Sequence, residues 1–257
     1  MPAAIDLTEP EVERYARHIL LPDVGGTGQM RLKRAHVLVI GAGGLGSPSL
    51  MYLAAAGVGQ LTLIDPDLVD RSNLQRQILF STADIGRGKA AAAAQRLAAL
   101  NPEITITPID ARLDAANADG LIKTADLVLD GSDNFATRFL VADACQRQHR
   151  TLVSAAVFRH AAQITTVKPH AAPHLPCYRC LHPAPPHDDP AASCAEIGLL
   201  GSTTGVAGTL QATAALHELL GIGTGLAGKL LLWEALTMRF RLISVPRDLN
   251  CPHCHAR

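Results

Sequence analysis

The sequence lacks an excess of charge of either sign. Its 257 residues carry 23 lysines and arginines against 23 aspartates and glutamates. Attachment to nucleic acid or to an anionic membrane surface requires a cluster of positive charge, and the chain has no basic run. The balance therefore argues against both classes of function, so binding partners must be sought in local sites.

Long uninterrupted apolar runs are also absent. The most apolar helical stretch, residues 205–220, contains Gln211 and Glu218, so it predicts a buried core helix and not a membrane span. The N-terminal segment carries acidic residues where a secretion signal would carry basic ones followed by apolar ones. We therefore expect a cytoplasmic protein with no membrane or nucleic-acid partner.

The most informative part of the chain is a strand, a glycine-rich turn and a helix. Residues 35–40 form a short apolar run typical of a buried parallel strand, and a helical segment follows over 47–56. Between them, Gly41, Gly43 and Gly46 match the pattern G-x-G-x-x-G. This pattern provides a tight turn, a close backbone approach to a phosphate, and helix N–H groups that face it. It predicts a nucleotide site. The alternative is that these glycines serve only helix–strand packing.

The next predicted strand, 61–64, ends at Asp65, where a dinucleotide enzyme places the carboxylate that binds a ribose hydroxyl. The residues beyond it differ from those of a dehydrogenase, because polar and cationic side chains follow over 72–77 and at Lys89. A triphosphate carries more charge than a dinucleotide and benefits from a bidentate arginine and a lysine. The sequence therefore favours ATP. The alternative is that Arg76 and Lys89 are solvated surface cations.

Strand and helix signals then alternate along the chain. The expected elements are helix 89–100, strand 103–109, helix 114–123, strand 127–129, helix 135–149, strands 151–157 and 163–167, helix 205–220, and two closing strands within 229–245. Such repeats predict an α/β fold with a Rossmann-like, doubly wound, mostly parallel sheet that ends in antiparallel strands. Ligands of these sheets bind at the carboxyl ends of the strands.

Two further features bear on the nucleotide site. Asp133 follows strand 127–129 and could face a nucleotide from the opposite side of the crevice, directly or through Mg²⁺. The alternative is a plain helix cap by Asp133 or Asn134. Residues 9–20 have a helical pattern, and we expect the loop 25–28 to separate this helix from the first strand. The helix is then free to pack away from its own site or to reach that of a neighbouring chain.

Four of the six cysteines form two C-x₂-C pairs, Cys177 with Cys180 and Cys251 with Cys254. Each pair can supply two thiolates to one tetrahedral ion, and two pairs complete a closed structural zinc site. Such an ion would fasten the C-terminus to the rest of the chain. The alternatives are a redox dithiol or four unremarkable thiols.

The remaining two cysteines stand alone. Cys145 lies inside a predicted helix, so a packed thiol is its expected role. Cys194 lies beside a proline-rich, charged segment, and we expect a mobile loop over 183–195. A partly exposed cysteine in such a loop is a candidate nucleophile.

In combination, these motifs resemble the ubiquitin-activating-like adenylyltransferases that act on bacterial sulfur carriers in molybdopterin and thiamine biosynthesis. The matching features are GAGGLG at 41–46, Asp65, SNLQRQ at 72–77, Lys89, DGSDN at 130–134, CYRC at 177–180, Cys194, and CPHC at 251–254. The resemblance extends from the segment around Arg17 to Cys254, nearly the whole chain.

The resemblance implies that the chain binds Mg-ATP and the C-terminal Gly-Gly tail of a small ubiquitin-like carrier. The tail carboxylate would attack the α-phosphate, releasing pyrophosphate and leaving an acyl-adenylate for sulfur transfer. The molybdopterin-synthase small subunit is the expected carrier, with the thiamine-biosynthesis carrier as the alternative. A separate persulfide donor is expected, since no rhodanese-like domain follows Cys254. Two alternatives from other classes are an NAD(P)-dependent oxidoreductase and a non-catalytic carrier-binding module.

The resemblance also implies roles for individual residues. Asp65 would contact the ribose, and Asp133 would engage Mg²⁺. The expected nucleotide contacts are Gly41, Gly43, Gly44, Gly46, Asp65, Ser72, Asn73, Leu74, Gln75, Arg76, Lys89, Asp133 and Asn134. The expected catalytic residues are Arg17, Arg76, Lys89, Asp133 and Cys194. Of these, Arg17 resembles the arginine that such homodimers lend to the partner's ATP site.

Two points complete the expectation. Family members often have Glu-Gly-Gln where this chain has Ala161-Ala162-Gln163, so contacts to the carrier tail differ there. We expect one adenylating domain over 1–257, since domains commonly run to about 100–200 residues and larger α/β domains are frequent. Its expected parts are an N-terminal helix and loop (1–34), a nucleotide-binding core (35–170) and a zinc-fastened C-terminal part (171–257).

Overall fold

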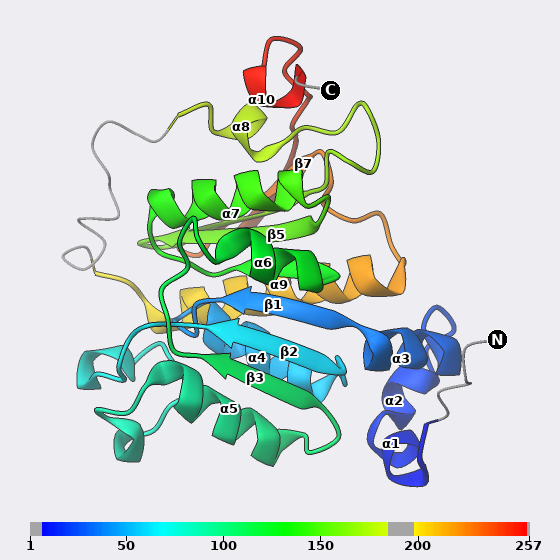
Figure 1. The fold of residues 1–257 in the computed structure, drawn as a ribbon, viewed down its shortest axis with the longest axis vertical. Coiled ribbons are helices and arrows are strands. Elements are labelled where there is room, and N and C mark those ends of the chain that lie inside the picture. Colours follow the sequence, from blue (N-terminus) through cyan, green and yellow to red (C-terminus); the bar gives the residue numbers. More distant parts are fainter. Residues whose placement is uncertain (1–6, 185–197, 256–257) are drawn as a thin grey trace.

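A central sheet organises the computed structural model, which describes residues 7–184 and 198–255 (Figure 1). Its strand order is β3-β2-β1-β4-β5-β6-β7-β8. The strands are β1 (His36–Ile40), β2 (Gln60–Ile64), β3 (Thr105–Ile109), β4 (Leu127–Asp130), β5 (Thr151–Phe158), β6 (Ala161–Val167), β7 (Lys229–Glu234) and β8 (Arg239–Ser244). The first five are parallel and the last three join antiparallel. The predicted fold class is confirmed.

Helices cover both faces of the parallel part of the sheet, α4, α5 and α9 on one face and α6 and α7 on the other. The described helices are α1 (Glu9–Arg14), α2 (Ala16–Ile19), α3 (Gly25–Arg34), α4 (Gly46–Ala55), α5 (Lys89–Leu100), α6 (Ala118–Thr124), α7 (Phe135–Arg147), α8 (Tyr178–Leu181), α9 (Gly201–Leu220) and α10 (Pro252–His255). Within the described residues, none of these helices is both long and apolar enough to span a lipid bilayer.

Strand β1 shows why the sheet has two covered faces. Its side chains alternate between two apolar clusters, as the two-residue period of a strand requires. Val37 and Val39 belong to the cluster that includes residues of α4, α5 and α9. Leu38 and Ile40 belong to the cluster that includes residues of α6 and α7. All four are buried, so β1 is the centre of the parallel part.

Helix α9 crosses α4 at very short range. Gly208 makes this possible, because a Cβ there would lie 2.4 Å from the Leu45 carbonyl oxygen. The Ser49 hydroxyl, on α4, donates to the Gly208 carbonyl oxygen at 2.9 Å. Helix α9 also packs on β5 and β6. Small residues at the crossing therefore let this helix approach α4 closely.

The N-terminal unit, residues 9–34, differs from the predicted helix and loop. The helix breaks at Tyr15, whose buried ring would collide with a Cβ at Gly57 and whose hydroxyl accepts from the Asn101 amide at 2.8 Å. The predicted loop 25–28 is instead the first turn of α3. Gly28 serves a close contact there, since its Cβ would lie 3.0 Å from Val24 and 3.1 Å from Leu220.

Most of the predicted mobile loop, residues 185–195, lies outside the described residues, as does Cys194. The segments that flank it are placed. Helix α8 precedes it on the α7 side of the sheet, and α9 begins shortly after it. At the far edge of the sheet, every residue of β8 is exposed.

Candidate functional site

The parallel strands create a crevice between β1 and β4. From β1 the chain adds β2 and then β3 on one side, and it returns to add β4 on the other side. Nucleotides bind at such switch points, outside the carboxyl ends of the strands. The turns after β1 and β4 are in contact there, because the Gly131 N–H donates to the Ile40 carbonyl oxygen at 3.0 Å. The predicted site residues that follow these strands are thereby brought together.

The glycine turn, residues 41–46, has the geometry that the motif predicts. Gly41 has φ +86°, a conformation that favours glycine, and a Cβ at Gly46 would lie 1.9 Å from the Gly41 carbonyl oxygen. A Cβ at Gly44 would lie 3.2 Å from Thr204, at the start of α9. Beside Gly43 there is more room, since a Cβ would meet only the Gln77 amide nitrogen, at 3.8 Å. Glycine is therefore needed for packing at 46, whereas the space beside position 43 is open.

Asp65 links the glycine turn to the loop after β2. Its carboxylate oxygens accept from the Ala42 N–H at 2.7 Å and from the Asp67 N–H at 2.9 Å. Burial raises the pKa of Asp65, while these hydrogen bonds and Lys89 act in the opposite direction. Each oxygen retains a second acceptor position, so a bond from a ribose hydroxyl is compatible with this arrangement.

Lys89 is buried at the start of α5, so it is not the solvated cation of the alternative interpretation. Its ammonium group lies 2.9 Å from an Asp67 carboxylate oxygen, and the backbone N–H of Lys89 donates to the Asp67 carbonyl oxygen at 2.8 Å. The sequence interpretation did not select Asp67. The signal was present, since Asp67 lies two residues after Asp65 in the loop that follows β2.

The predicted contacts over 72–76 lie beside this crevice with varied exposure. Arg76 is half-buried and donates to the Ser72 carbonyl oxygen at 3.1 Å, and the Asn73 amide oxygen accepts from the Asp70 N–H at 3.3 Å. Ser72 is exposed and Leu74 packs against the main core. Gln75 touches the start of α9, because a Cβ at Gly201 would lie 2.2 Å from the Gln75 carbonyl oxygen.

Gln77 is a further residue that the sequence interpretation passed over, although it lies within the quoted motif. It is buried, and its side-chain oxygen has no hydrogen-bond partner among the described residues. Its amide nitrogen is the group nearest to the open position at Gly43. A buried polar group without a partner is costly, so this amide is a candidate ligand contact.

The turn after β4 shows which of two polar residues, Asp133 or Asn134, caps the following helix. The Asn134 side-chain oxygen accepts from the Thr137 N–H at 2.8 Å, so Asn134 caps α7. Asp133 is exposed and makes no cap. Beneath it Asp130 is fully buried, with one oxygen accepting from the Ser132 N–H at 2.9 Å. Burial raises the pKa of Asp130.

The same turn contains oxygens that suit a hard cation. The second Asp130 carboxylate oxygen and the Ser132 hydroxyl are buried without hydrogen-bond partners among the described residues. The exposed Asp133 carboxylate lies in the same five-residue turn. Carboxylate and hydroxyl oxygens are the ligands that Mg²⁺ prefers, so these residues fit a magnesium ion that accompanies a nucleotide.

Arg17 lies away from this crevice within a single chain. It is exposed on α2, in the N-terminal unit that leads into β1 from its amino end. Neighbouring Arg14 donates to the Leu100 carbonyl oxygen, just before β3. Figure 1 shows α1 to α3 at the end of the sheet opposite the glycine turn. An Arg17 contribution to catalysis therefore requires a second chain.

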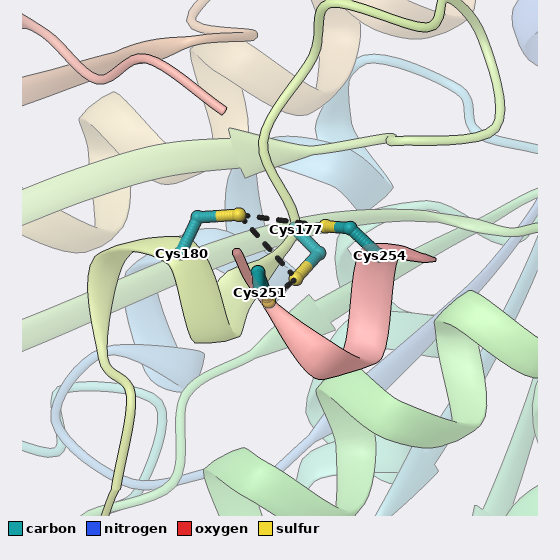
Figure 2. Close-up of side chains that lie close together, drawn as sticks. All are labelled: Cys177, Cys180, Cys251 and Cys254. Atoms are coloured by element: carbon teal, nitrogen blue, oxygen red, sulfur yellow. Dashed lines mark hydrogen bonds between the residues drawn. The ribbon is translucent and has the colours of Figure 1, made fainter. Parts of the chain in front are cut away.

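The four predicted zinc ligands meet in one cluster between α8 and α10, as Figure 2 shows. All four sulfur atoms lie within 4.8 Å of one another, with contacts of 3.8, 3.7 and 3.4 Å. Four thiolates about 2.3 Å from a tetrahedral zinc ion would lie about 3.8 Å apart. The residues therefore fit zinc, and their convergence favours one four-ligand site over two separate dithiols.

The cysteine cluster is fastened to the helix that begins at the candidate site. Arg179 makes two hydrogen bonds to the Asp143 carboxylate on α7, at 2.9 and 2.6 Å. The Tyr178 ring packs on Phe139 at 5.4 Å between ring centroids. Cys145, on the same helix, is buried, and burial raises the pKa of its thiol, as expected of a packed cysteine.

A small pocket lies between α8 and the strands β5 to β7. Its polar lining residues are Ser154, Gln163, Thr165, Tyr178 and His182. Ser154 is the register partner of Asp130, so the pocket adjoins the buried carboxyl group. Sequence reasoning identified none of these as pocket residues, because the antiparallel pairing of β5 and β6 and the packing of α8 bring them together only in the folded chain.

Comparison with known proteins identifies the family. The model of the ThiF family matches residues 15–253. A sulfur carrier protein adenylyltransferase from Thermus thermophilus is 48% identical over 250 residues, covering 96% of this chain and 92% of the relative. A SAMP-activating enzyme E1 from Haloferax volcanii is 42% identical, covering 97% and 91%.

A solved structure supports the fold. The crystal structure of E. coli MccB with MccA-N7isoASN has a TM-score of 0.81 at 23% identity, over 95% of this chain and 74% of that chain. At this identity the likeness concerns the fold alone. The family match covers the glycine turn, the loop after β2, the turn after β4 and the cysteines Cys177, Cys180 and Cys251, and it ends one residue before Cys254. The chain belongs to the ThiF family.

Proposed function

We propose that this protein is an ATP-dependent adenylyltransferase that activates the C-terminal Gly-Gly carboxylate of a small ubiquitin-like sulfur-carrier protein. The observation that carries the proposal is one crevice in which three unlike groups converge. These are the open glycine turn, the buried Lys89 and the turn that presents Asp133. The similarity to a sulfur carrier protein adenylyltransferase over nearly the whole chain supports the same function.

In the proposed reaction, ATP lies across the carboxyl ends of β1, β2 and β4. Backbone N–H groups of the glycine turn and the start of α4 face the phosphates. Lys89 and Arg76 balance phosphate charge, while Asp65 accepts from a ribose hydroxyl. Asp133 and Asp130 would hold Mg²⁺, which would neutralise charge on the phosphates. Positioning and charge stabilisation are the main contributions that such transfers need.

The chemical step joins the carrier tail to the nucleotide. A carboxylate oxygen of the tail forms a bond to the α-phosphorus, and the bond from that phosphorus to the bridging oxygen breaks. Pyrophosphate leaves with the bonding electron pair, and an acyl-adenylate results. The pocket between α8 and β5–β7 adjoins Asp130 and is our candidate for the tail. Gln163 lines this pocket and could contact the carrier tail there. The two residues before it, Ala161 and Ala162, stand where family members often have Glu and Gly.

The cysteines have two proposed roles. The cluster of Cys177, Cys180, Cys251 and Cys254 holds structural zinc and fastens the C-terminus beside α7. Cys194, outside the described residues, acts after adenylate formation if it acts covalently. We therefore expect Cys194→Ala to retain pyrophosphate exchange and to impair sulfur transfer at most in part. The sulfur itself comes from a separate persulfide donor.

The proposed assembly is a cytoplasmic homodimer in which Arg17 of each chain serves the other chain's site. Arg17 belongs to α2, and the position of α2 at the opposite end of the sheet supports this arrangement. The molybdopterin-synthase small subunit is the preferred carrier, although the motifs resemble enzymes of the molybdopterin and thiamine pathways alike. The thiamine-biosynthesis carrier is the second candidate.

Carrier-dependent exchange of labelled pyrophosphate into ATP tests the proposal. We expect exchange with one of the two carriers and none with the same carrier lacking its last two glycines. Carrier binding without exchange would instead identify a non-catalytic binding module. Nicotinamide-cofactor binding without exchange would identify an oxidoreductase. Comparing the two carriers side by side assigns the pathway.

A further inference from the structure

The turn that presents Asp133 is anchored on both sides of Ser132. The Ser132 N–H donates to a carboxylate oxygen of the buried Asp130 at 2.9 Å. The Ser132 carbonyl oxygen accepts two hydrogen bonds from Arg138, from Nε at 3.3 Å and from Nη2 at 3.0 Å. Both polar groups of one residue are thus held by buried, ionisable side chains.

Arg138 is an unusual residue for this position. Only 8% of it is exposed, and its guanidinium group lies over the Phe135 ring at 5.2 Å. Among the described residues, no carboxylate approaches it within the 4.0 Å of a direct ion pair. Burial raises the pKa of Asp130 and the charge of Arg138 lowers it, but both observed donors of Arg138 are used on one backbone oxygen, so charge balance alone does not explain this geometry.

We propose that Arg138 is a positioning residue that holds Asp133 in place for adenylyl transfer, an inference that rests on the proposed function. The Ser132 carbonyl oxygen shares a rigid peptide plane with the nitrogen and Cα of Asp133. Two hydrogen bonds from a planar guanidinium fix the orientation of that plane. The direction in which the Asp133 side chain leaves the backbone is fixed with it.

The residue after Asp133 is anchored as well, because Asn134 caps α7 through the Thr137 N–H. Asp133 therefore combines an exposed side chain with a backbone that is held on both sides. Such an arrangement leaves the carboxylate accessible to a nucleotide while limiting its movement. Displacements of about 1 Å can cost about 100-fold in rate, which makes this restraint consequential.

Three variants separate positioning from structure. Arg138→Met keeps an unbranched side chain of related length and removes both donors. Arg138→Lys keeps a charge and a single donor group in place of the planar fork. Arg147→Met is the matched control, because Arg147 lies on the same helix, is about half exposed and pairs with Asp119 at 2.8 Å.

Carrier-dependent pyrophosphate exchange and hydrogen–deuterium exchange are measured for each variant. For Arg138→Met we expect kcat to fall about 10- to 100-fold while KM for Mg-ATP changes less than about threefold. Amide exchange should become faster in the peptide 130–137 and stay unchanged in the rest of α7. Arg138→Lys should recover part of the rate, and Arg147→Met should match the unmodified protein in both measurements.

Other results would overturn the inference. An Arg138→Met protein with normal kcat, or with a lower kcat but unchanged amide exchange over 130–137, would show that Arg138 does not position Asp133. Faster amide exchange over the whole of α7, together with loss of bound zinc, would assign Arg138 a structural role. If the unmodified protein exchanges no pyrophosphate, the proposed function fails, and so does the catalytic role given to Arg138. The amide-exchange comparison then still decides whether Arg138 anchors the turn.

Discussion

Individual charged side chains in this protein are held by near neighbours. Glu11 shows this in the N-terminal unit, where one carboxylate oxygen accepts from Lys33 and from the Thr8 N–H, both at 2.7 Å. The carboxylate is buried, with 3% exposed. Burial raises the pKa of Glu11, but the hydrogen bonds to Lys33 and Thr8 outweigh this and leave the pKa lowered. The folded state therefore favours the charged form.

This lowered pKa gives a prediction about stability and pH. A carboxyl group with a lowered folded pKa stabilises the protein above its unfolded pKa, and the stabilisation is lost as the pH falls through the folded value. At neutral pH, Glu11→Gln should reduce the free energy of unfolding by about 1 kcal/mol, because the neutral amide lacks the charge that pairs with Lys33 and strengthens the hydrogen bond from Thr8. Urea titrations should show this difference shrinking once the pH falls below about 4.5. An equal difference at pH 7 and pH 4 would contradict the assignment.

At the scale of single residues, the sequence predicted those site residues that belong to a recognisable motif. It missed those whose importance depends on their burial in the folded chain. Asp65 and Lys89 were predicted because their spacing from a glycine turn is itself a signal. Asp130 and Arg138 were not selected, although Asp130 lies in a quoted motif. Their importance depends on burial and on hydrogen bonds to Ser132, which only the folded chain defines.

Among the elements, the glycine turn between β1 and α4 contains two glycines whose surroundings differ most clearly. One is tightly packed and the other borders open space. At Gly46 an added Cβ would meet the Gly41 carbonyl oxygen at 1.9 Å, and that oxygen belongs to backbone that cannot yield easily. At Gly43 an added Cβ would meet only the Gln77 amide, at 3.8 Å. Two alanine substitutions three residues apart should therefore act in different ways.

We expect Gly46→Ala to destabilise the fold by about 3 kcal/mol or more, because backbone must move. Gly43→Ala should change the free energy of unfolding by less than about 1 kcal/mol but should abolish detectable ATP binding, since the methyl group takes the space left for a phosphate. Thermal melting and a nucleotide-binding titration measure both effects. Normal ATP binding by Gly43→Ala would support the view that these glycines serve packing alone.

The order of elements was easier to predict than their packing. Buried parallel strands such as β1 and β4 are recognised from short apolar runs, and the alternation with helices predicts the sheet. The prediction for the N-terminal unit was wrong in detail, because the glycines at 25, 26 and 28 suggested a loop where α3 begins. Tertiary contacts determine the structure of that region. The first helix ends at Tyr15, whose ring packs against Gly57, and the absence of a side chain at Gly28 allows Val24 and Leu220 to approach closely.

For the molecule as a whole, the cysteine cluster joins two distant parts of the chain. Cys177 and Cys251 lie 74 positions apart in sequence, and both are buried. The protein should contain about one zinc ion per chain. Cys251→Ser should lower both zinc content and melting temperature, because metal-binding energy contributes to folding. Metal analysis and calorimetry test this, with Cys145→Ala as a control that keeps its zinc. Full zinc occupancy in Cys251→Ser would refute the site.

The proposed dimer gives a prediction of its own. Arg17→Ala and Asp133→Ala homodimers should each be inactive in pyrophosphate exchange. If Arg17 serves the partner's site, a mixed dimer contains one site with both residues intact, so mixing should restore up to about one half of normal activity per mixed dimer. Native mass spectrometry must confirm that mixed dimers form. Mixed dimers without activity would place Arg17 outside the shared site.

Helix α9 spans the molecule from one functional edge to the other. Its first turn touches Gln75 and the glycine turn, whereas the Leu220 carbonyl oxygen at its end accepts from Arg31 of α3 at 2.8 Å. Twenty helical residues form a rod about 30 Å long. Gly208, which lies against the Leu45 carbonyl oxygen, is near the middle of this helix. Because one continuous helix is held there against α4, it ties the position of the N-terminal unit to that of the glycine turn.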